Sequence, residues 1–379
     1  MNSNSSSSLV RVMHVIDSLA IGGKERMAVD LANAASAKGC HVSMCVTRCE
    51  ADLAAGLDQQ VRLHVLKRRS TFDVRGMLHF LKALKLEKPE VLHIHGRSSF
   101  SFVVFLKSLG MIRQPLIFHD HYGVEMDFSV PLWMKCWAKR YAAVYVGVYE
   151  RLTAWAEKAG FAKDRVRIFG NAIDLGRLES AEPVDLRKAL DIPAGRRLFI
   201  AVCDLRPEKG VDVLLDAIAQ LKPADCVFVI AGGQSHPAYA DQCRRKAQEG
   251  GLENKVIFLG KREDAPGLLK NADFAVMPSL SESGPLVLIE YLAAGLPFVS
   301  SLVGDIACRT AKRFPDRFVP PGRPDLLAGK IEQLLACSLQ ELRRLREEES
   351  EFAREEFDLR KKIDEWIHLY QQAAASAHA

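Results

Sequence analysis

The chain has 379 residues, 48% of them hydrophobic and 26% charged, and its 52 basic and 47 acidic residues leave a net charge of +5. This length suits two globular domains better than one, and the composition excludes wholesale disorder. The small charge excess excludes the footprint of a nucleic-acid-binding protein, while weak attraction to phosphates or to an anionic membrane face stays compatible with it.

Neither the cysteines nor the apolar segments indicate a secreted or membrane-spanning protein. The nine cysteines are odd in number and scattered, so we expect a reducing compartment, with no disulfide framework and no zinc site. Residues 1–9 are mostly polar and Ser-rich, which is typical of a disordered tail. Every apolar run is too short or too polar to cross a bilayer. We therefore expect a cytoplasmic protein, at most peripheral to the cytoplasmic membrane.

Short apolar runs alternate with helical patterns along the first half of the chain. Gly22 and Gly23 form the turn that follows the first of these runs. The pattern predicts strands at 10–16, 41–47, 91–94, 116–119, 143–148 and 165–169, and helices at 24–38 and 80–88.

The same alternation restarts after residues 171–183, a polar stretch that we expect to be poor in helix. The pattern then predicts strands at 198–202, 226–230, 256–259, 274–277 and 298–300, and a helix at 211–221. Strands that alternate with helices predict parallel sheets covered on both faces. The fold class is therefore α/β, with two doubly wound, Rossmann-like domains and a ligand-binding cleft between them.

We place the N-terminal domain at residues 10–175 and the second domain at 176–355. A charged helical region follows residue 339, and a last helix lies within 356–379. This last helix carries an apolar stripe at helical spacing, so we expect it to pack back on the N-terminal domain.

The segment around Glu282 and Glu290 carries the strongest chemical signal. It reads SLSESGPLVLIEYLAAGLP and follows the predicted strand at 274–277. Gly284 and Pro285 open a helix whose free N–H groups and partial positive charge can hold phosphate. Carboxylates on either side can accept hydrogen bonds from sugar hydroxyls. The alternative is one surface glutamate and one helix glutamate that pairs with a cation.

A second signal is the segment DLRPEKG, which contains Arg206 and Lys209 and lies between a predicted strand and a predicted helix. The two cations can converge on an anion at the helix start. Fixed cations of this kind can stabilise negative charge that grows on a bound anion during a reaction. The alternative is a pair of solvent-exposed residues.

Two further groups of residues lie in the first half. Gly22 and Gly23 allow a ligand to approach the backbone at a helix start, although a plain tight turn explains them too. His93, His95, His119 and His121 form two His-x-His pairs; we consider a metal site the weaker interpretation and place His93 in the core. The chain has no Asp-x-Asp triplet, which supports metal-independent chemistry without a cofactor.

Two glutamates eight positions apart, followed by LAAGLP, resemble the Glu-x7-Glu motif of the family 4 retaining glycosyltransferases, which have the GT-B fold. By this resemblance Glu282 contacts the transferred sugar and Glu290 the ribose, while Arg206 and Lys209 neutralise the donor diphosphate. His119 matches a histidine that lines the acceptor side of the cleft. The same resemblance adds Gly22, Gly23, Arg262, Ser283, Gly284 and Pro285 to the donor site, and His95 and His121 to the acceptor side.

The resemblance implies a hexosyltransferase-type enzyme that is retaining and metal-independent. Its donor would be a nucleotide diphosphate-sugar, with UDP-sugars favoured. Its acceptor would be a glycan or a lipid-linked molecule in bacterial surface polysaccharide, lipopolysaccharide or glycolipid biosynthesis. Two alternatives stay open: a nucleotide-sugar epimerase on the same fold, and a non-catalytic sugar-nucleotide-binding subunit.

Residues 131–141 carry aromatic residues at helical spacing with lysines and an arginine beside them. This pattern is typical of a helix that packs on a core, and also of a helix that lies in a membrane interface.

Overall fold

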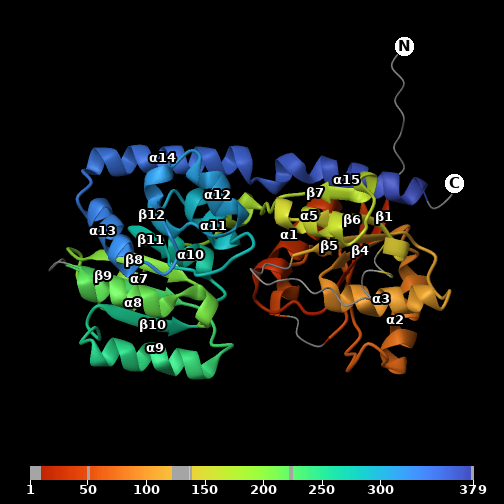
Figure 1. Ribbon diagram of the computed structural model, residues 1–379, viewed down its shortest axis with the longest axis horizontal. Helices are drawn as coiled ribbons and strands as arrows, with labels where there is room; N and C mark the ends of the chain where they lie inside the picture. The colour runs from red at the N-terminus through yellow and green to blue at the C-terminus, as the bar shows by residue number, and fades with distance from the viewer. Residues whose placement is uncertain (1–9, 49–51, 122–135, 137–138, 222–224, 377–379) are drawn as a thin grey trace, which may run out of the picture. The chain divides into compact units, whose positions relative to one another are not determined.

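The computed structural model describes residues 10–48, 52–121, 136, 139–221 and 225–376, and these form two compact units (Figure 1). Unit 1 contains the described residues up to 174 together with those from 359 onward, and unit 2 contains residues 175–358. Most of residues 131–141 fall outside the described residues, so the expectation for that segment stays a prediction. We describe each unit by itself.

Unit 1 is built on a seven-stranded sheet in which all paired strands are parallel, as the alternating pattern predicts. Across the sheet the strands are β3 (Arg62–Val65), β2 (His41–Val46), β1 (Arg11–Ile16), β4 (Val91–His95), β5 (Leu116–Asp120), β6 (Ala142–Gly147) and β7 (Val166–Ile168). The sequence pattern did not reveal β3, because this edge strand has no fully buried residue to mark it.

Helices cover both faces of this sheet. A core of side chains from alternate strand positions packs one face against α2 (Val74–Glu87), α3 (Arg97–Ser108) and α5 (Glu150–Lys158). On the opposite face lie α1 (Gly23–Ala37) and α15 (Leu359–Ala375), which contact each other. Helix α2 begins six residues before its predicted start, because the Asp73 carboxylate accepts a hydrogen bond from the Gly76 N–H and caps it.

Unit 2 has a six-stranded sheet whose paired strands are also parallel. Across the sheet the strands are β10 (Val256–Gly260), β9 (Cys226–Ala231), β8 (Arg197–Val202), β11 (Phe274–Met277), β12 (Phe298–Ser301) and β13 (Phe318–Val319). Its helices are α6 (Leu175–Ser180), α7 (Leu186–Ala189), α8 (Val211–Gln220), α9 (Pro237–Glu249), α10 (Ala265–Leu269), α11 (Leu286–Ala293), α12 (Gly304–Ala311), α13 (Pro324–Leu335) and α14 (Leu339–Glu356). Short 3-10 turns lie at η1 (Asp52–Gly56) and η2 (Lys163–Arg165) in unit 1, and at η3 (Pro207–Lys209) and η4 (Pro315–Arg317) in unit 2.

Helix α6 lies within residues 171–183, the stretch that the sequence predicts to be poor in helix. Burial of Leu175 and Leu178 on one side stabilises this short helix. A six-residue helix of ordinary composition leaves little periodic signal, so tertiary packing decides its conformation here.

The chain leaves unit 1 after Asp174 and returns to it at Leu359, and these two crossings lie together. The Leu359 N–H donates to the Ile173 carbonyl at 3.0 Å. Helix α15 then places Trp366 and Tyr370, both fully buried, against the sheet of unit 1. The C-terminal residues are therefore part of the core of unit 1.

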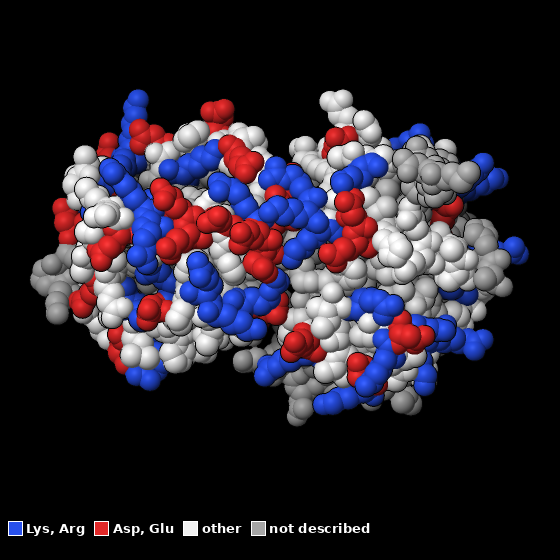
Figure 2. All heavy atoms as spheres, turned by 90° about the horizontal axis from the view of Figure 1, so that it is seen from above, with Lys and Arg blue, Asp and Glu red and all other residues white. Residues whose placement is uncertain are grey.

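The surface seen in Figure 2, which includes α14, carries basic and acidic side chains intermingled. Arg344 and Glu348 form an ion pair within α14. Arg309 of α12 pairs with Glu356 and links α14 to the rest of unit 2. No helix among the described residues is long and apolar enough to cross a bilayer.

We predict that Trp366→Ala lowers the free energy of unfolding of the chain by about 3–5 kcal/mol, because it removes a fully buried indole from unit 1. Urea denaturation followed by far-ultraviolet circular dichroism measures the change. The control is Leu339→Ala on α14, where the side chain is 65% exposed and the expected change is within about 0.5 kcal/mol. Equal stability of the two variants would contradict a core role for α15.

Candidate functional site

The loops that follow β8 and β11 meet at the carboxyl edge of the sheet in unit 2, because these strands are neighbours. Gly210 ends the first loop with φ of +61°, and a Cβ added there would overlap the Pro278 carbonyl oxygen of the second loop. The Leu280 N–H donates to the Glu208 carbonyl at 2.8 Å. Only glycine fits at residue 210, and the two loops are held in one fixed arrangement.

This contact brings together two side chains predicted to bind the same ligand. The Lys209 Nζ lies 2.5 Å from Oε1 of Glu282, and the Ser279 hydroxyl donates to the same oxygen at 2.9 Å. Both side chains are mostly buried, with 15% and 11% exposed. Arg206 stands beside Lys209 in the chain and is exposed, and no described residue forms an ion pair or side-chain hydrogen bond with it. The site therefore offers a paired lysine and a second cation open to an anion.

The start of α11 lies next to this pair. The helix begins at Leu286 with Pro285 as its N-cap, one residue later than the sequence pattern predicts. The Asp305 N–H donates to the Ser283 carbonyl at 2.9 Å, which ties the loop to the start of α12. The buried Tyr291 hydroxyl accepts from the Val202 N–H at 2.9 Å, which ties α11 to the end of β8. The amides of the first turn of α11 are thus held in a fixed position where an anion can bind.

Glu290 lies one helical turn further along α11 and pairs with a residue that sequence reasoning missed. The Arg177 Nη2 lies 2.7 Å from Oε1 of Glu290, and both side chains are more than three-quarters buried. Arg177 belongs to α6, the helix that was not predicted, so no sequence signal pointed to it. The pair leaves Glu290 neutralised in the absence of a ligand.

The predicted donor-site residue Arg262 is engaged within its own turn. Its guanidinium donates to both carboxylate oxygens of Asp264, at 2.8 and 2.5 Å. This forked hydrogen bond raises the pKa of Arg262 and lowers that of Asp264. A ligand role for Arg262 stays a prediction, and it would require the guanidinium to share or release Asp264.

In unit 1, Gly22 is the N-cap of α1, as the sequence indicates for a glycine turn at a helix start. A Cβ at Gly22 would overlap the carboxylate of Glu25. Lys24, which the sequence analysis did not single out as a site residue, lies at 2.5 Å from Asp17 and 3.2 Å from Glu25. The turn therefore combines free backbone amides with a lysine held by two carboxylates.

Five histidines lie on one face of the sheet in unit 1, the face covered by α1 and α15. His93 and His95 alternate with core residues along β4, and His14 and His119 occupy matching positions on β1 and β5. The strand period of two and the parallel register place all these rings together with His121. Both His-x-His pairs are visible in the sequence, whereas His14, a single imidazole in an apolar strand, forms no motif.

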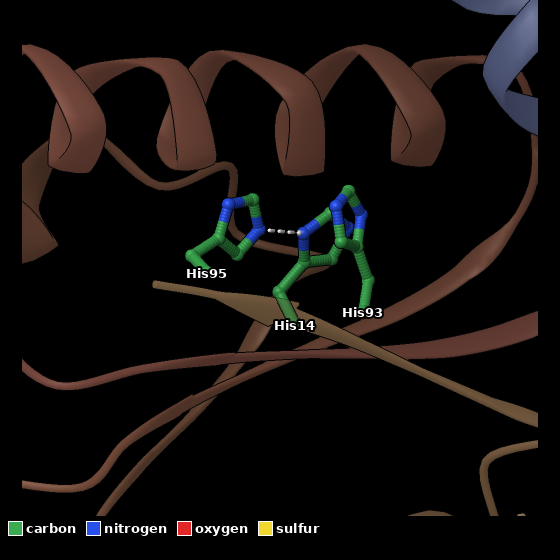
Figure 3. A group of neighbouring side chains, drawn as sticks. All are labelled: His14, His93 and His95. Atoms are coloured by element: carbon green, nitrogen blue, oxygen red, sulfur yellow. Dashed lines mark hydrogen bonds between the residues drawn. The ribbon is translucent and has the colours of Figure 1, made fainter. Parts of the chain in front are cut away.

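These imidazoles form two hydrogen-bonded rows (Figure 3 shows His14, His93 and His95). In one row, His14 Nδ1 lies 3.0 Å from His95 Nε2, and His95 Nδ1 lies 3.1 Å from His121 Nε2. In the other, His93 Nε2 lies 3.1 Å from His119 Nδ1. A neutral imidazole has one donor and one acceptor nitrogen, so each bond fixes the tautomers along its row.

Helix α15 completes the second row. The Tyr370 hydroxyl lies 2.9 Å from His93 Nδ1. The Trp366 ring stacks on the His93 ring and lies tilted against the His119 ring. Burial lowers the pKa of His14 to about 3, and it lowers the pKa of His93, His95 and His119 well below the ordinary value. The histidines are thus neutral in the folded chain.

Two triplets of these histidines have ligand nitrogens within 4.8 Å of one another: His14, His93 and His95, and His95, His119 and His121. A bound Zn²⁺ would need three lone pairs aimed at one point about 2.0–2.1 Å from each nitrogen. The rings of His93 and His95 instead stack at 4.3 Å with their planes 25° apart. Both nitrogens of His93 already have partners. The triplet that contains His93 therefore fits a hydrogen-bonded core better than a metal centre.

The three histidines predicted for the cleft differ in their access to a ligand. His95 and His119 are fully buried, and His119 Nε2 has no partner among the described residues. His121 is partly exposed, and burial with the nearby charge of Lys24 lowers its pKa to about 3. Of the three, His121 is the one with a surface that a ligand can touch, and it is supported from beneath by His95.

The arrangement in unit 2 suits a phosphorylated ligand that also carries hydroxyl groups. Lys209 and Arg206 supply positive charge, the start of α11 supplies amides, and Glu282 and Glu290 supply acceptors on either side. Each carboxylate is paired with a cation, so neither is an uncompensated charge before a ligand arrives.

Family models match both halves of the chain. Residues 21–177 match the model described as Glycosyltransferase Family 4, and residues 184–354 match the model described as Glycosyl transferases group 1.

Curated proteins match smaller shares of the chain than the two family models do together. A D-inositol 3-phosphate glycosyltransferase of Jonesia denitrificans is 29% identical over 45% of this chain and 43% of its own length, so the chain spans less than half of that relative. An uncharacterized glycosyltransferase of Methanocaldococcus jannaschii is 28% identical over 70% of this chain and 71% of its own. A UDP-Gal:alpha-D-GlcNAc-diphosphoundecaprenol alpha-1,3-galactosyltransferase of Escherichia coli is 25% identical over 64% and 65%.

Solved structures share the fold over nearly the whole chain. Anabaena Alr3699/HepE, crystallised with UDP-glucose, has a TM-score of 0.80 at 19% identity and covers 96% of this chain and 99% of its own. The sucrose-phosphate synthase of Thermosynechococcus elongatus has a TM-score of 0.75 at 21% identity, with coverage of 97% and 100%. These likenesses, with the two parallel sheets, confirm the α/β fold of the GT-B type.

We predict that Gly210→Ala destabilises the chain and weakens ligand binding in unit 2. The left-handed backbone costs alanine about 1–2 kcal/mol, and the clash with Pro278 adds to that cost. Gly251→Ala has the same backbone strain without a neighbour within 4 Å, and Gly195→Ala has neither problem. Thermal unfolding should rank the three losses in that order. A Gly210→Ala loss no larger than that of Gly251→Ala would contradict the close approach of the loops.

We also predict that the buried histidines make the chain sensitive to acid. Their folded pKa values lie below the unfolded value of about 6.5, so their full stabilisation is present above about pH 6.5 and is lost as the pH falls towards 3. In that pH window each buried histidine lowers the free energy of unfolding by up to about 1.4 kcal/mol for each unit by which the pH falls. Urea denaturation at several pH values measures the slope.

The matched variants are His14→Asn, in the buried row, and His79→Asn, on the exposed side of α2. His14→Asn should reduce the pH slope between about pH 6.5 and 4 because one titrating group is removed, while His79→Asn should leave it unchanged. The same slope in both variants and the parent chain would refute this account.

Proposed function

The chain belongs to the glycosyltransferases whose halves match the family 4 and group 1 models, and we propose that it transfers a sugar from a nucleoside diphosphate-sugar to a glycan or lipid-linked acceptor. The transfer retains the configuration of the anomeric carbon, as the Glu-x7-Glu motif implies for this family. The pathway we propose is bacterial surface polysaccharide, lipopolysaccharide or glycolipid biosynthesis.

One observation carries the proposal: the Lys209–Glu282 pair at the carboxyl edge of the sheet, beside the open cation Arg206. A diphosphate can draw Lys209 to its oxygens, and the sugar hydroxyls can then donate to the carboxylate that Lys209 leaves. Donor binding thus replaces the Lys209–Glu282 pair by two contacts, one between Lys209 and the phosphate and one between Glu282 and the sugar hydroxyls. The Ser279 hydroxyl holds Glu282 in place during this exchange.

The cations also match the chemistry of the transfer. The bond between the anomeric carbon and the phosphate oxygen breaks, and its electron pair stays on the diphosphate. The acceptor oxygen bonds to the same carbon, and its proton passes to the departing phosphate or to water. Lys209, Arg206 and the start of α11 lie where this negative charge grows, so they can stabilise it without a divalent metal.

UDP is the donor base that we favour. Among the solved structures with this fold, Alr3699/HepE was crystallised with UDP and with UDP-glucose. The Escherichia coli relative is named for transfer from UDP-Gal. That relative's acceptor is a diphosphoundecaprenol-linked sugar, which supports a lipid-linked acceptor here. His121 and the turn at Gly22 and Gly23 are the unit 1 residues that we propose to contact the ligands.

We predict that Lys209→Ala and Glu282→Gln each lower the rate of sugar transfer by about 10²–10³-fold, the effect of removing one group that stabilises charge in the transition state. The measurement is release of nucleotide from a panel of UDP-, GDP- and ADP-sugars in the presence of EDTA. Lys312→Ala and Glu253→Gln are the matched controls, because both side chains are exposed and lie outside the residues assigned to the site.

The proposal would be supported if nucleotide is released from one donor, if this release persists in EDTA, and if it falls only in the site variants. Activity that EDTA abolishes would reject the metal-independent mechanism. Release of an altered free sugar without any acceptor would indicate an epimerase instead. Inversion at the anomeric carbon, seen by NMR of the product, would disprove retention. Failure to bind any nucleotide would overturn the proposal as a whole.

A further inference from the structure

Three histidines gather at the carboxyl ends of β4 and β5 in unit 1. His95 is the last residue of β4, His119 lies opposite it on β5, and His121 follows that strand. One ring nitrogen from each lies within 4.8 Å of one from each of the other two. We call this group the β4–β5 triplet. It shares only His95 with the triplet that contains His93.

The spacing of two nitrogens in this triplet suits a shared metal ion. His95 Nδ1 and His121 Nε2 lie 3.1 Å apart. Two nitrogens bound to one tetrahedral Zn²⁺ at about 2.0–2.1 Å are about 3.3 Å from each other, so a small adjustment lets this pair hold an ion. Without metal, a single proton lies between the two nitrogens, and an ion would take its place.

His119 supplies the third lone pair. Its Nε2 is buried and has no hydrogen-bond partner among the described residues, whereas its Nδ1 lies 3.1 Å from His93 Nε2. When the proton is on Nδ1 and is donated to His93, Nε2 is an acceptor that has no donor. A buried acceptor without a partner costs free energy, and a metal ion bound to this nitrogen removes that cost.

The hydrogen bonds behind the triplet suit metal ligands. His95 Nε2 lies 3.0 Å from His14 Nδ1, and donation of its proton to His14 leaves His95 Nδ1 as a lone pair (Figure 3). The Tyr370 hydroxyl can accept from His93 Nδ1, which leaves His93 Nε2 as the acceptor for His119. Histidines that bind a metal normally donate their other N–H to such a partner, which fixes the tautomer and the ring orientation.

The β4–β5 triplet differs from the triplet that contains His93 in what an ion would have to displace. His93 has both nitrogens hydrogen-bonded, so binding there would break two bonds. The His119 and His121 rings overlie each other at 3.9 Å with their planes 38° apart, and an ion requires the His121 ring to turn. His121 is the partly exposed member of the triplet, so its ring has room for this rotation.

The charge beside the triplet also permits a cation. Lys24 is the positive residue whose charge reaches His121. Its Nζ lies 2.5 Å from Asp17 and 3.2 Å from Glu25, so the three side chains together carry a net charge of −1. A divalent ion at the triplet therefore does not face an unpaired lysine.

We propose that His95, His119 and His121 bind one Zn²⁺, or a similar divalent ion that prefers imidazole, with a water molecule in the fourth position. A ligand set of three imidazoles disfavours Mg²⁺ and Ca²⁺, which take oxygen ligands. Three protein ligands and one open position are typical of zinc sites that exchange their fourth ligand. The site goes beyond the proposed function, because it belongs to unit 1 and the transfer proposed above does not require it.

The test is calorimetric titration of the full chain, without an affinity tag and freed of metal by EDTA and dialysis, with zinc chloride. One ion should bind per chain, and magnesium chloride should not bind. Cobalt(II) should give the visible absorption of a four-coordinate ion at the same site. His121→Asn should weaken zinc binding by more than about 100-fold, because it removes a ligand, whereas loss of an outer partner costs about 10–100-fold.

The matched variants are His79→Asn, an exposed histidine of α2, and His14→Asn, which removes only the outer partner of His95. His79→Asn should leave zinc binding unchanged, and His14→Asn should weaken it by about 10–100-fold. Far-ultraviolet circular dichroism checks that each variant is folded. The proposal would be overturned if the folded chain binds no zinc, if His121→Asn binds it as tightly as the parent chain, or if His79→Asn weakens it as much as His121→Asn does.

Discussion

The close approach of Gly210 to Pro278 is the constraint on which the candidate site in unit 2 depends. Parallel pairing of β8 with β11 brings the two loops to one edge, and the missing side chain at residue 210 lets their backbones touch. Lys209 and Glu282 meet because each lies next to that contact in the chain. The site is therefore set by backbone packing, and its charged side chains are positioned by it.

Charge neutralisation before ligand binding is a second property of this site. Glu282 is paired with Lys209 and Glu290 with Arg177, all four side chains being largely buried. A buried carboxylate without a partner would be costly, so these pairs stabilise the fold around the site. A ligand with both anionic and hydroxyl groups can replace such a pair, because its anionic group binds the cation while its hydroxyl groups donate to the carboxylate.

The sequence was sufficient to predict the features that depend on local pattern and not those that depend on packing. Strand–helix alternation predicted both parallel sheets, and it placed Lys209 and Glu282 in loops that follow neighbouring strands, where the two side chains do meet. Their ligand roles stay predictions. Arg177 could not be found, because it lies on a helix stabilised by two buried leucines rather than by its own propensity. Edge strand β3 was missed because it has no fully buried residue, and its pairing with β2 decides its conformation.

The histidine rows also depend on packing contacts that the local sequence does not reveal. The motifs around His93 and His119 were visible, but His14 joins them only through the strand order of the sheet, and Tyr370 only through a helix almost 280 residues away in the chain. Such a buried polar cluster requires every member to be present, because each ring supplies the hydrogen-bond partner of another. Its partners come from four separate parts of the sequence.

Because α15 belongs to unit 1, the order of synthesis matters for how this chain folds. A ribosome makes the strands of unit 1 first, then all of unit 2, and only afterwards the helix that covers His93 and supplies Trp366. Until then one face of the nascent first sheet lacks part of its cover and its buried imidazoles lack a partner. Unit 2 has no such dependence and can complete itself earlier, so the domain that is started first is finished last.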